Sequence, residues 1–326
     1  MKGIIVLGAA IALALSGCSS SSDSGNTTTG GVTYTGKTTA AVITSANATT
    51  LLSATNGSAG TGSGVAAVAP KLSQKSSVRP LGLAGQLVSQ AKQALAKKPS
   101  QNVAAGVVQT QTTTIDGATD LGPGGTGTMT MVSEIDDVTG LGSVTMTANN
   151  FGVAPDLTNG TMTITVSAVD AANNPTSMSI TFTDFSTTDA TGTSRMGGSI
   201  SLARVGNTET LTMDFVAVAS TGESFKMQNF KLVSTYDTFN ALLSDSISGR
   251  LYDSVSGYID ITTTNPLLYS PAGSFYPSSG GPMIITGANN AKIRMTPVNA
   301  TDVTIEVDAD GDGIYESTQT VAQSSL

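Results

Sequence analysis

A run of alternating carboxylates near the C-terminus is the strongest chemical signal in the sequence. In the stretch "VTIEVDADGDGIYEST" (303–318), three aspartates occupy alternate positions, and Gly313 allows the chain to turn. Carboxylates this close together repel one another, and a hard divalent cation between them relieves the repulsion. We therefore predict a Ca²⁺ site, because this ion accepts several oxygen ligands in a loose geometry. The expected ligands are Asp308, Asp310, Asp312, the backbone carbonyl of Ile314, and Glu316.

The loop resembles the first half of an EF-hand loop and departs from the second half. Counted from Asp308, the twelfth position is Gln319 instead of a bidentate glutamate. The flanking segments Val303–Val307 and Ile314–Tyr315 are predicted to be strands, whereas an EF-hand has helices there. We expect weak binding, on the order of millimolar as in extracellular modules, with a structural role. The alternative is a polar hairpin tip that holds no ion.

A second motif, "GVTYTGKT" (Gly31–Thr38), matches the G-x-x-x-x-G-K-[ST] pattern of a phosphate-binding loop. Such a loop needs a buried strand before it and a helix after it, so that free backbone N–H groups surround the phosphates. Here a Ser-, Thr- and Gly-rich stretch precedes the motif, and the β-branched and aromatic residues 32–35 favour an extended strand. We therefore predict that the chain binds no nucleotide.

Catalytic motifs are weak throughout the chain. Without any His there is no Ser-His-Asp or Cys-His catalysis and no His-ligated zinc. Ser89 and Lys92 fit the S-x-x-K pattern of penicillin-recognising enzymes, but the partner motifs are missing. Glu134, Asp136 and Asp137 could form a carboxylate pair for glycoside hydrolysis, although a solvated turn explains them better. We predict a protein that is not an enzyme, with an enzyme acting on envelope glycans as an alternative.

The N-terminal residues determine where the protein resides. Lys2 precedes a short apolar segment, Gly3–Leu15, which leads into "LSGC", ending at Cys18. This is the pattern of a secretory signal, and the apolar segment is too short to span a bilayer comfortably. It closely resembles the lipobox of bacterial lipoproteins, which implies that residues 1–17 are removed and that Cys18 is acylated. The alternative is an ordinary signal-peptidase site with an unmodified cysteine.

The residues after the lipobox fit a flexible membrane tether. Cys18 is the only cysteine, so it has no disulfide partner, and residues 18–31 are rich in Ser, Thr and Gly. In bacterial lipoproteins, a serine such as Ser19 after the acylated cysteine implies sorting to the outer membrane of a Gram-negative host. Loss of Lys2 changes the formal charge from −8 to −9, and an acidic exported chain is a poor ligand for nucleic acid. We predict a cell-envelope lipoprotein held on the membrane by its N-terminal lipid.

Residues 32–100 form a small N-terminal segment in which two helices are expected. The stretch "KTTAAVI" (Lys37–Ile43) predicts a short strand. Thr44 can cap a first helix over Asn47–Ala54. Apolar residues every four positions predict a second helix over about Pro80–Lys97.

Residues 101–326 change to a period of two, which predicts half-buried strands in a mainly antiparallel β domain. Turn-forming Gly, Asn, Asp and Pro residues separate the alternating segments, so consecutive strands should pair as hairpins. We predict an antiparallel meander, arranged as a sandwich, an open barrel or an elongated single sheet. The clearest alternating segments are Gly127–Met131, Gly142–Ala148, Gly160–Val166, Met178–Phe185, Gly198–Ala203, Thr210–Val218 and Ser224–Leu232.

A loose internal repeat overlies these segments. Strands that open with glycine alternate with strands that end in a polar residue followed by phenylalanine. The glycines at 127, 160 and 198 are 33 and 38 residues apart, which suits a stack of hairpins. We predict that the phenylalanines fill the core and do not contact a ligand. The pairs are Asn150-Phe151, Asp184-Phe185 and Asn229-Phe230.

Most of the mature chain resembles a group of uncharacterised proteobacterial lipoproteins. Besides the lipobox and the Asp-rich loop, the resemblance rests on "YTGKTTAAVITSANATTLL" (34–52), "SGRLYDSVSGYIDITTTNPL" (248–267) and "GPMIITGANNAKIRM" (281–295). The group provides no activity to assign to this chain. We expect a structural, adhesion or envelope-assembly role, with envelope proteins or lipid as partners. The alternative is a carrier that encloses lipid or another apolar ligand in a curved β-sheet.

Overall fold

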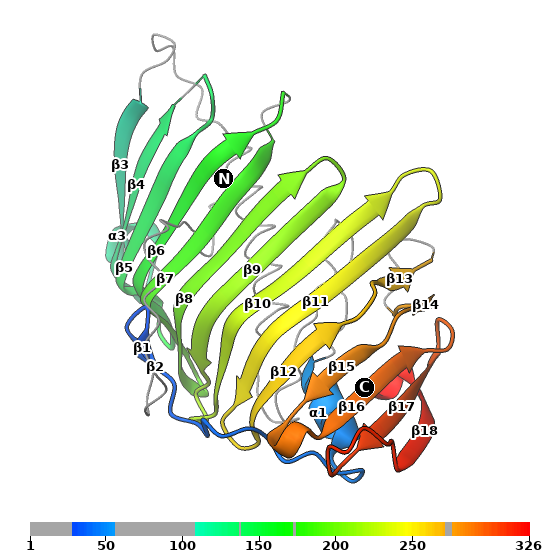
Figure 1. Cartoon of the computed structure of the whole chain (residues 1–326). Helices are drawn as coiled ribbons and strands as arrows, with labels where there is room; N and C mark the ends of the chain where they lie inside the picture. The colour runs from blue at the N-terminus through cyan, green and yellow to red at the C-terminus, as the bar shows by residue number, and fades with distance from the viewer. Residues whose placement is uncertain (1–27, 56–107, 137, 172–173, 271–275) are drawn as a thin grey trace. The chain divides into compact units, whose positions relative to one another are not determined.

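The computed structural model describes residues 28–55, 108–136, 138–171, 174–270 and 276–326, and strands dominate these ranges (Figure 1). The chain divides into two compact units. In the described ranges, unit 1 contains residues 29–32 and 108–202, and unit 2 contains residues 28, 33–55 and 203–326. The division therefore falls inside the segment 101–326, which the sequence suggested as one β domain.

Unit 1 is built from long antiparallel strands joined by short turns. Every alternating segment predicted here lies inside an observed strand, and the strands extend several residues further. A single helical turn, α3 (Gly117–Asp120), separates the first two strands. The strands are β3 (Val108–Asp116), β4 (Gly125–Asp136), β5 (Gly142–Val153), β6 (Asp156–Val169), β7 (Pro175–Asp189) and β8 (Gly192–Val205).

Unit 2 continues the meander with two long hairpins and ends in shorter strands. Its helical elements are α1 (Ala48–Thr55) and the 3₁₀ turns η1 (Ala288–Asn290) and η2 (Gln323–Ser325). The strands are β9 (Thr208–Val218), β10 (Ser224–Asp237), β11 (Leu242–Asp253), β12 (Gly257–Thr263), β13 (Leu267–Tyr269), β14 (Ser279–Gly280), β15 (Met283–Thr286), β16 (Lys292–Pro297), β17 (Asp302–Asp308) and β18 (Ser317–Ala322).

The hydrogen-bonded order of the strands follows the chain. It runs β18-β17-β16-β15-β12-β11-β10-β9-β8-β7-β6-β5-β4-β3, with β13 paired to β11 and β14 paired to β13. A separate two-stranded hairpin consists of β1 (Thr28–Thr29) and β2 (Val32–Thr33). Strands β3 to β18 form a single hydrogen-bonded sheet, and the prediction of an antiparallel meander is confirmed.

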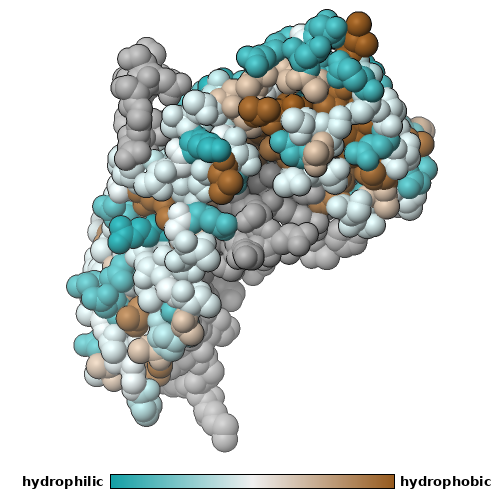
Figure 2. All heavy atoms as spheres, turned by 90° about the horizontal axis from the view of Figure 1, so that it is seen from below, coloured by the Kyte–Doolittle hydropathy of each residue, from teal (hydrophilic) through white to brown (hydrophobic). Residues whose placement is uncertain are grey.

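The strands of unit 1 have one apolar face and one face rich in hydroxyl groups. On the apolar face, Met162, Ile164 and Phe182 are no more than 1% exposed. Burial of each such side chain contributes about 1.5–3 kcal/mol relative to an exposed position. The alternation that predicted the strands therefore also identifies the core. Seen from the side shown in Figure 2, much of the described surface is nearly white, as expected for Ser, Thr and Gly.

On the opposite face of unit 1, Thr and Ser form rows that cross β3 to β7. Thirteen of the fifteen positions in three successive rows are Thr or Ser. Neighbouring hydroxyls are close, with 3.2 Å between Thr145 and Thr163 and 3.3 Å between Thr147 and Thr161. The rows are Thr114, Thr130, Thr147, Thr161 and Thr183; Thr112, Val132, Thr145, Thr163 and Thr181; and Thr110, Glu134, Ser143, Thr165 and Ser179.

The polar–Phe repeat marks β-bulges. Asn150, Asp184 and Asn229 have φ of 46°, 48° and 49°, and the strand register shifts beside each of them. In each bulge the next residue is buried, with Phe151 at 8%, Phe185 at 7% and Phe230 at 1% exposure, so the prediction of core phenylalanines is confirmed.

The backbone N–H of each bulge has its own acceptor. The N–H of Asn150 donates to Oδ1 of Asn159, and the N–H of Asn229 donates to Oδ1 of Asp214, both at 2.7 Å. The N–H of Asp184 donates to the carbonyl of Gly30 at 2.7 Å. The extra residue of a bulge does not pair in the strand ladder, so its N–H would otherwise lack an acceptor. These three acceptors remove the free-energy cost of an unpaired N–H.

Glycines face the bulges because no side chain fits there. A Cβ at Gly127 would lie 2.1 Å from the Asn150 carbonyl oxygen, and one at Gly160 would lie 2.2 Å from that of Asp184. A Cβ at Gly249 would lie 2.4 Å from Cα of Phe230. Two of the three spaced glycines, Gly127 and Gly160, therefore belong to the same structural feature as the polar–Phe pairs, and Gly249 has the same role at Phe230.

In unit 2 the N-terminal segment packs on β11 and β12. The ring of Tyr34 is 0% exposed and meets Tyr252 edge-on, with centroids 5.6 Å apart. The N–H of Ala41 donates to the Tyr258 carbonyl, and the N–H of Ala288 donates to the Ala41 carbonyl, both at 2.8 Å. The segments 34–52, 248–267 and 281–295 therefore meet within this unit.

The predicted strand over Lys37–Ile43 is wrong, because only Ala40 makes a bridge, to Tyr258. The first predicted helix is confirmed as α1, which begins after Thr44 and Asn47 exchange hydrogen bonds of 2.8 and 3.3 Å. The second, over Pro80–Lys97, lies outside the described residues. None of the helices in the described ranges has the length and hydrophobicity required to cross a membrane.

The glycine opposite a bulge should be far more sensitive to substitution than an ordinary turn glycine. For Gly160→Ala (φ 98°) we expect a loss of about 3 kcal/mol or more, because the new Cβ overlaps the Asp184 carbonyl. For Gly140→Ala, whose φ is 69° and whose Cβ meets nothing within 4 Å, we expect about 1–2 kcal/mol. Urea unfolding of both variants measures the difference, and equal losses would contradict this account.

A buried carboxylate on β11 makes the stability of unit 2 depend on pH. Asp245 is 0% exposed, with Ser234 as its cross-strand neighbour on β10. Burial raises the pKa of Asp245 from 3.8 to about 7, and neither of its carboxylate oxygens accepts a hydrogen bond within the described residues. Because the folded state then binds this proton more tightly than the unfolded chain, stability falls as the pH rises from about 4 to about 7.

Asp245→Asn keeps the size of the side chain and removes its ionisation. Between pH 5 and pH 8 we expect the parent to lose roughly 3 kcal/mol more of its free energy of unfolding than this variant does. Urea titrations at the two pH values provide the measurement. Asp156→Asn removes an exposed carboxylate and should follow the parent. A pH dependence that Asp245→Asn leaves unchanged would show that another group is responsible.

Candidate metal centre

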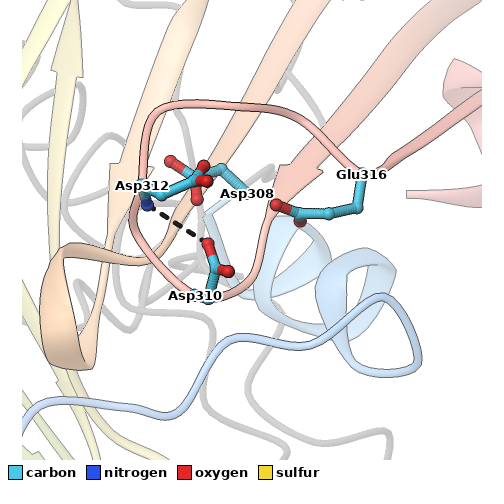
Figure 3. Close-up of side chains that lie close together, drawn as sticks. All are labelled: Asp308, Asp310, Asp312 and Glu316. Atoms are coloured by element: carbon cyan, nitrogen blue, oxygen red, sulfur yellow. Dashed lines mark hydrogen bonds between the residues drawn. The ribbon is translucent and has the colours of Figure 1, made fainter.

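The loop between β17 and β18 brings four carboxylates together (Figure 3). One oxygen from each of Asp308, Asp310, Asp312 and Glu316 lies within 4.8 Å of the others. In Figure 3, Glu316 extends toward the three aspartates from the opposite side of the loop. The loop turns at two glycines with left-handed backbone, Gly311 at φ 79° and Gly313 at φ 94°. The four side chains that the sequence singled out therefore form one cluster.

Asp308 is the fixed member of the cluster. It ends β17, is 0% exposed, and accepts hydrogen bonds from the N–H groups of Gly311 at 2.7 Å and Gly313 at 3.1 Å. One bond goes to Oδ1 and the other to Oδ2, so the loop backbone orients the whole carboxylate. Each oxygen keeps a second lone pair that a cation could use.

The other three carboxylates are exposed, and each one accepts a backbone N–H of the same loop. Asp310 accepts from Asp312 at 3.2 Å, and Asp312 accepts from Ile314 at 2.7 Å. Glu316 accepts from Ala309 at 2.9 Å, which ties the end of the loop to its beginning. In each case one oxygen makes the bond, so the second oxygen remains for a ligand.

The cluster carries an uncompensated negative charge. The guanidinium of Arg294 donates to both oxygens of Glu306, at 2.5 and 2.6 Å, and lies 4.1 Å from the ring centroid of Tyr315. This pairing lowers the pKa of Glu306. Within the described ranges, no Lys or Arg forms an ion pair with the four clustered carboxylates. Four like charges in this space favour a bound cation.

A neighbouring turn supports the loop from outside. Asn289 and Asn290 of η1 have φ of 55° and 61°. A Cβ at Gly311 would lie 2.2 Å from the carbonyl oxygen of Asn289, so the two backbones are in close contact. The Asn290 side-chain amide also donates to the Gly311 carbonyl at 3.4 Å. This support was not predicted, although the stretch "GANN" in the segment 281–295 is typical of residues with left-handed backbone in turns.

The flanks of the loop agree only in part with the prediction. The strand over Val303–Val307 is confirmed within β17, but the strand over Ile314–Tyr315 is wrong, because β18 begins only at Ser317. The side chain of Ile314 is 66% exposed, and its carbonyl remains a predicted ligand. Gln319, at the twelfth loop position, lies on β18 and donates to the Thr49 hydroxyl at 3.4 Å. Its side chain therefore makes a contact with α1.

The predicted carboxylate pair among Glu134, Asp136 and Asp137 falls at a turn. Oδ1 of Asp136 accepts hydrogen bonds from the N–H groups of Val138 and Thr139 at 2.9 and 2.8 Å, which cap the turn after β4. The bonds from Thr139 and Val138 lower the pKa of Asp136. Glu134 is exposed on β4. This supports the solvated-turn interpretation over a glycosidase pair, while Asp137 lies outside the described residues.

The other motifs give no site within the described ranges. After Gly31 the chain forms β2 and then an irregular segment. A phosphate-binding loop requires a helix directly after the motif, and none starts at Thr38. Cys18, Ser89 and Lys92 lie outside the described residues.

A shallow depression of about 330 Å³ lies beside the bulge of β10. Most of its lining is polar, and its central feature is the paired Arg250 and Asp260, joined by bonds of 2.7 and 2.9 Å. Such a surface does not favour an apolar ligand and offers no support for the carrier alternative. The lining residues are Gln228, Asn229, Gly249, Arg250, Asp260 and Ile261.

Comparison with known proteins places the chain in no family. Neither a protein-family model, nor a curated protein, nor a solved structure matches it.

Proposed function

We propose that the chain is an exported lipoprotein, anchored through Cys18, with a non-enzymatic structural, adhesion or envelope-assembly role and a weak structural Ca²⁺ site. The observation that carries the calcium part is the convergence of four carboxylates within 4.8 Å. The lipobox sequence supports the anchor. The two parts agree, because export would expose the loop to a compartment in which Ca²⁺ is plentiful.

The donor set favours Ca²⁺ over other metals. The cluster offers only oxygen atoms, and the chain has no His and a single Cys, so a softer metal would lack its preferred ligands. Mg²⁺ demands a near-ideal octahedron and gives up water reluctantly. Ca²⁺ tolerates an irregular shell, which the Ile314 carbonyl and water would complete. The missing glutamate at position 319 accounts for the weak affinity that we expect.

A bound ion would stabilise more than the loop itself. The loop connects β17 to β18, and β18 reaches the N-terminal segment through the Ser45–Ser317 hydroxyl contact at 2.9 Å and the Gln319–Thr49 bond. Neutralising the exposed carboxylates would therefore strengthen the end of unit 2 where α1 meets the last hairpin. A role of this kind is structural and requires no substrate.

The cellular setting follows from the anchor. Acylation at Cys18, with Ser19 next to it, places the protein on the outer membrane of a Gram-negative host. Its partners would then be envelope proteins or lipid. An acidic chain of this composition is suited neither to nucleic acid nor to nucleotides.

Thermal unfolding tests the calcium site. We expect millimolar Ca²⁺ to raise the Tm of the parent, with a stabilisation of about 1.4 kcal/mol when Ca²⁺ is tenfold above its Kd. The double variant Asp310→Asn with Asp312→Asn should lose this response, because two of the exposed ligands lose their charge. Asp308 is left unchanged in this test, since it also holds the backbone of the loop.

The matched control is Glu134→Gln with Asp156→Asn, which removes the same charge from exposed positions outside the cluster. It should respond to Ca²⁺ like the parent. A parent whose Tm does not change with Ca²⁺ would disprove the site. An equal response in the double variant would place the ion elsewhere.

Mass spectrometry of the N-terminal peptide from the native host tests the anchor. We expect a mature chain that starts at Cys18 and carries acyl groups on both the thiol and the amine. Cys18→Ser should abolish the modification and move the protein from the membrane fraction to the soluble fraction. An unmodified, uncleaved N-terminus in the parent would rule out the anchor and leave the calcium measurement unaffected.

A further inference from the structure

Within the described residues, β3 is an edge strand of the sheet. It is the terminal strand of the hydrogen-bonded order, and no strand in the described ranges pairs with its outer side. It pairs with β4 over nine consecutive positions, from Val108 opposite Asp136 to Asp116 opposite Thr128, without a register shift. About half of its backbone N–H and C=O groups must therefore point away from β4, as on any antiparallel edge.

As the structure describes it, β3 contains no Lys, no Pro and no bulge. Soluble proteins place Lys, Pro or a bulge on such a strand, or cover it. β3 has the sequence "VQTQTTTID", in which the only charge is Asp116 at its last position, and it contains no Pro. Its β-branched residues favour pairing. At the other end of the strand order, β18 is only six residues long and contacts the α1 region through Ser317 and Gln319.

We propose that β3 pairs antiparallel with β3 of a second copy of this chain, about a twofold axis at Thr112. This register places Thr110 opposite Thr114 of the partner copy and Val108 opposite Asp116. No like charges face each other in it. An identical strand is therefore a compatible partner. The N–H groups exposed on each edge would donate to the C=O groups exposed on the other.

The hydroxyl rows provide the second reason for this partner. Thr110, Thr112 and Thr114 are the outermost members of three rows that already cross five strands. Pairing about Thr112 continues the rows into the second copy, with Thr beside Thr at the junction. Contacts of the same kind form within the unit, as the Thr145–Thr163 distance of 3.2 Å shows. Cross-strand pairs of this kind stabilise an antiparallel sheet. The inference depends neither on calcium nor on acylation.

Two charge variants at the same positions test the antiparallel register. Both are made in the full chain carrying Cys18→Ser, so that no acyl group drives association. Thr110→Lys with Thr114→Glu places Lys opposite Glu in the antiparallel pair, and should dimerise at least as well as the parent. Thr110→Lys with Thr114→Lys places Lys opposite Lys, and should be monomeric at concentrations where the parent is a dimer. Light scattering coupled to size-exclusion chromatography gives the masses.

A cross-link locates the axis. Thr112→Cys, in the same Cys18→Ser background, should form an interchain disulfide on oxidation, because Cα atoms of directly opposed residues lie about 4.5–5.5 Å apart. Thr147→Cys, an exposed position on the internal strand β5, should not. Circular dichroism checks that every variant folds. A parent that stays monomeric at its highest soluble concentration overturns the proposal, even if β3 accepts a strand of another protein. Equal dimerisation of the two charge variants overturns it as well.

Discussion

The exclusion of side chains opposite the bulges is the constraint on which the rest of the sheet depends. Each bulge inserts a residue with left-handed backbone, and the neighbouring strand can approach it only where Cβ is missing. Gly127, Gly160 and Gly249 occupy these places, and any other residue there would meet backbone atoms within 2.1 to 2.4 Å. The bulges in turn direct Phe151, Phe185 and Phe230 into the core. These three sterically determined pairings thus fix the local register and part of the hydrophobic packing.

In unit 2 the candidate metal loop depends on segments that are distant in sequence. The loop follows β17, whose apolar residues Val303 and Ile305 are 0% exposed. It touches η1 through Gly311, while the next strand, β18, touches the α1 region. The segments 34–52, 248–267 and 281–295 and the Asp-rich loop therefore belong to one packed body. None of these segments forms its contacts alone.

The parts of the fold that could be predicted are those in which a residue's type reflects a local condition. The alternation of apolar and polar residues predicted the strands, because a strand with one buried face requires it. The spacing of the carboxylates predicted the acidic cluster. The strand expected at Ile314–Tyr315 failed, because Asp312 and Glu316 take backbone N–H groups of the loop and hold the chain in a turn. The strand expected at Lys37–Ile43 failed, because Ala41 bonds to Tyr258 through its N–H and to Ala288 through its carbonyl. Both failures arise from hydrogen-bond partners that lie outside the segment whose pattern predicted a strand.

The hydroxyl face of unit 1 has a consequence for how the protein responds to its surroundings. Most globular surfaces rely on Lys, Arg, Asp and Glu for solubility, and the interactions of those charges are screened as salt is added. In the three rows of Thr and Ser, Glu134 is the single ionisable side chain. The hydration of this face therefore comes from neutral groups, which mobile ions scarcely affect. A surface of this kind should keep its hydration over a wide range of ionic strength.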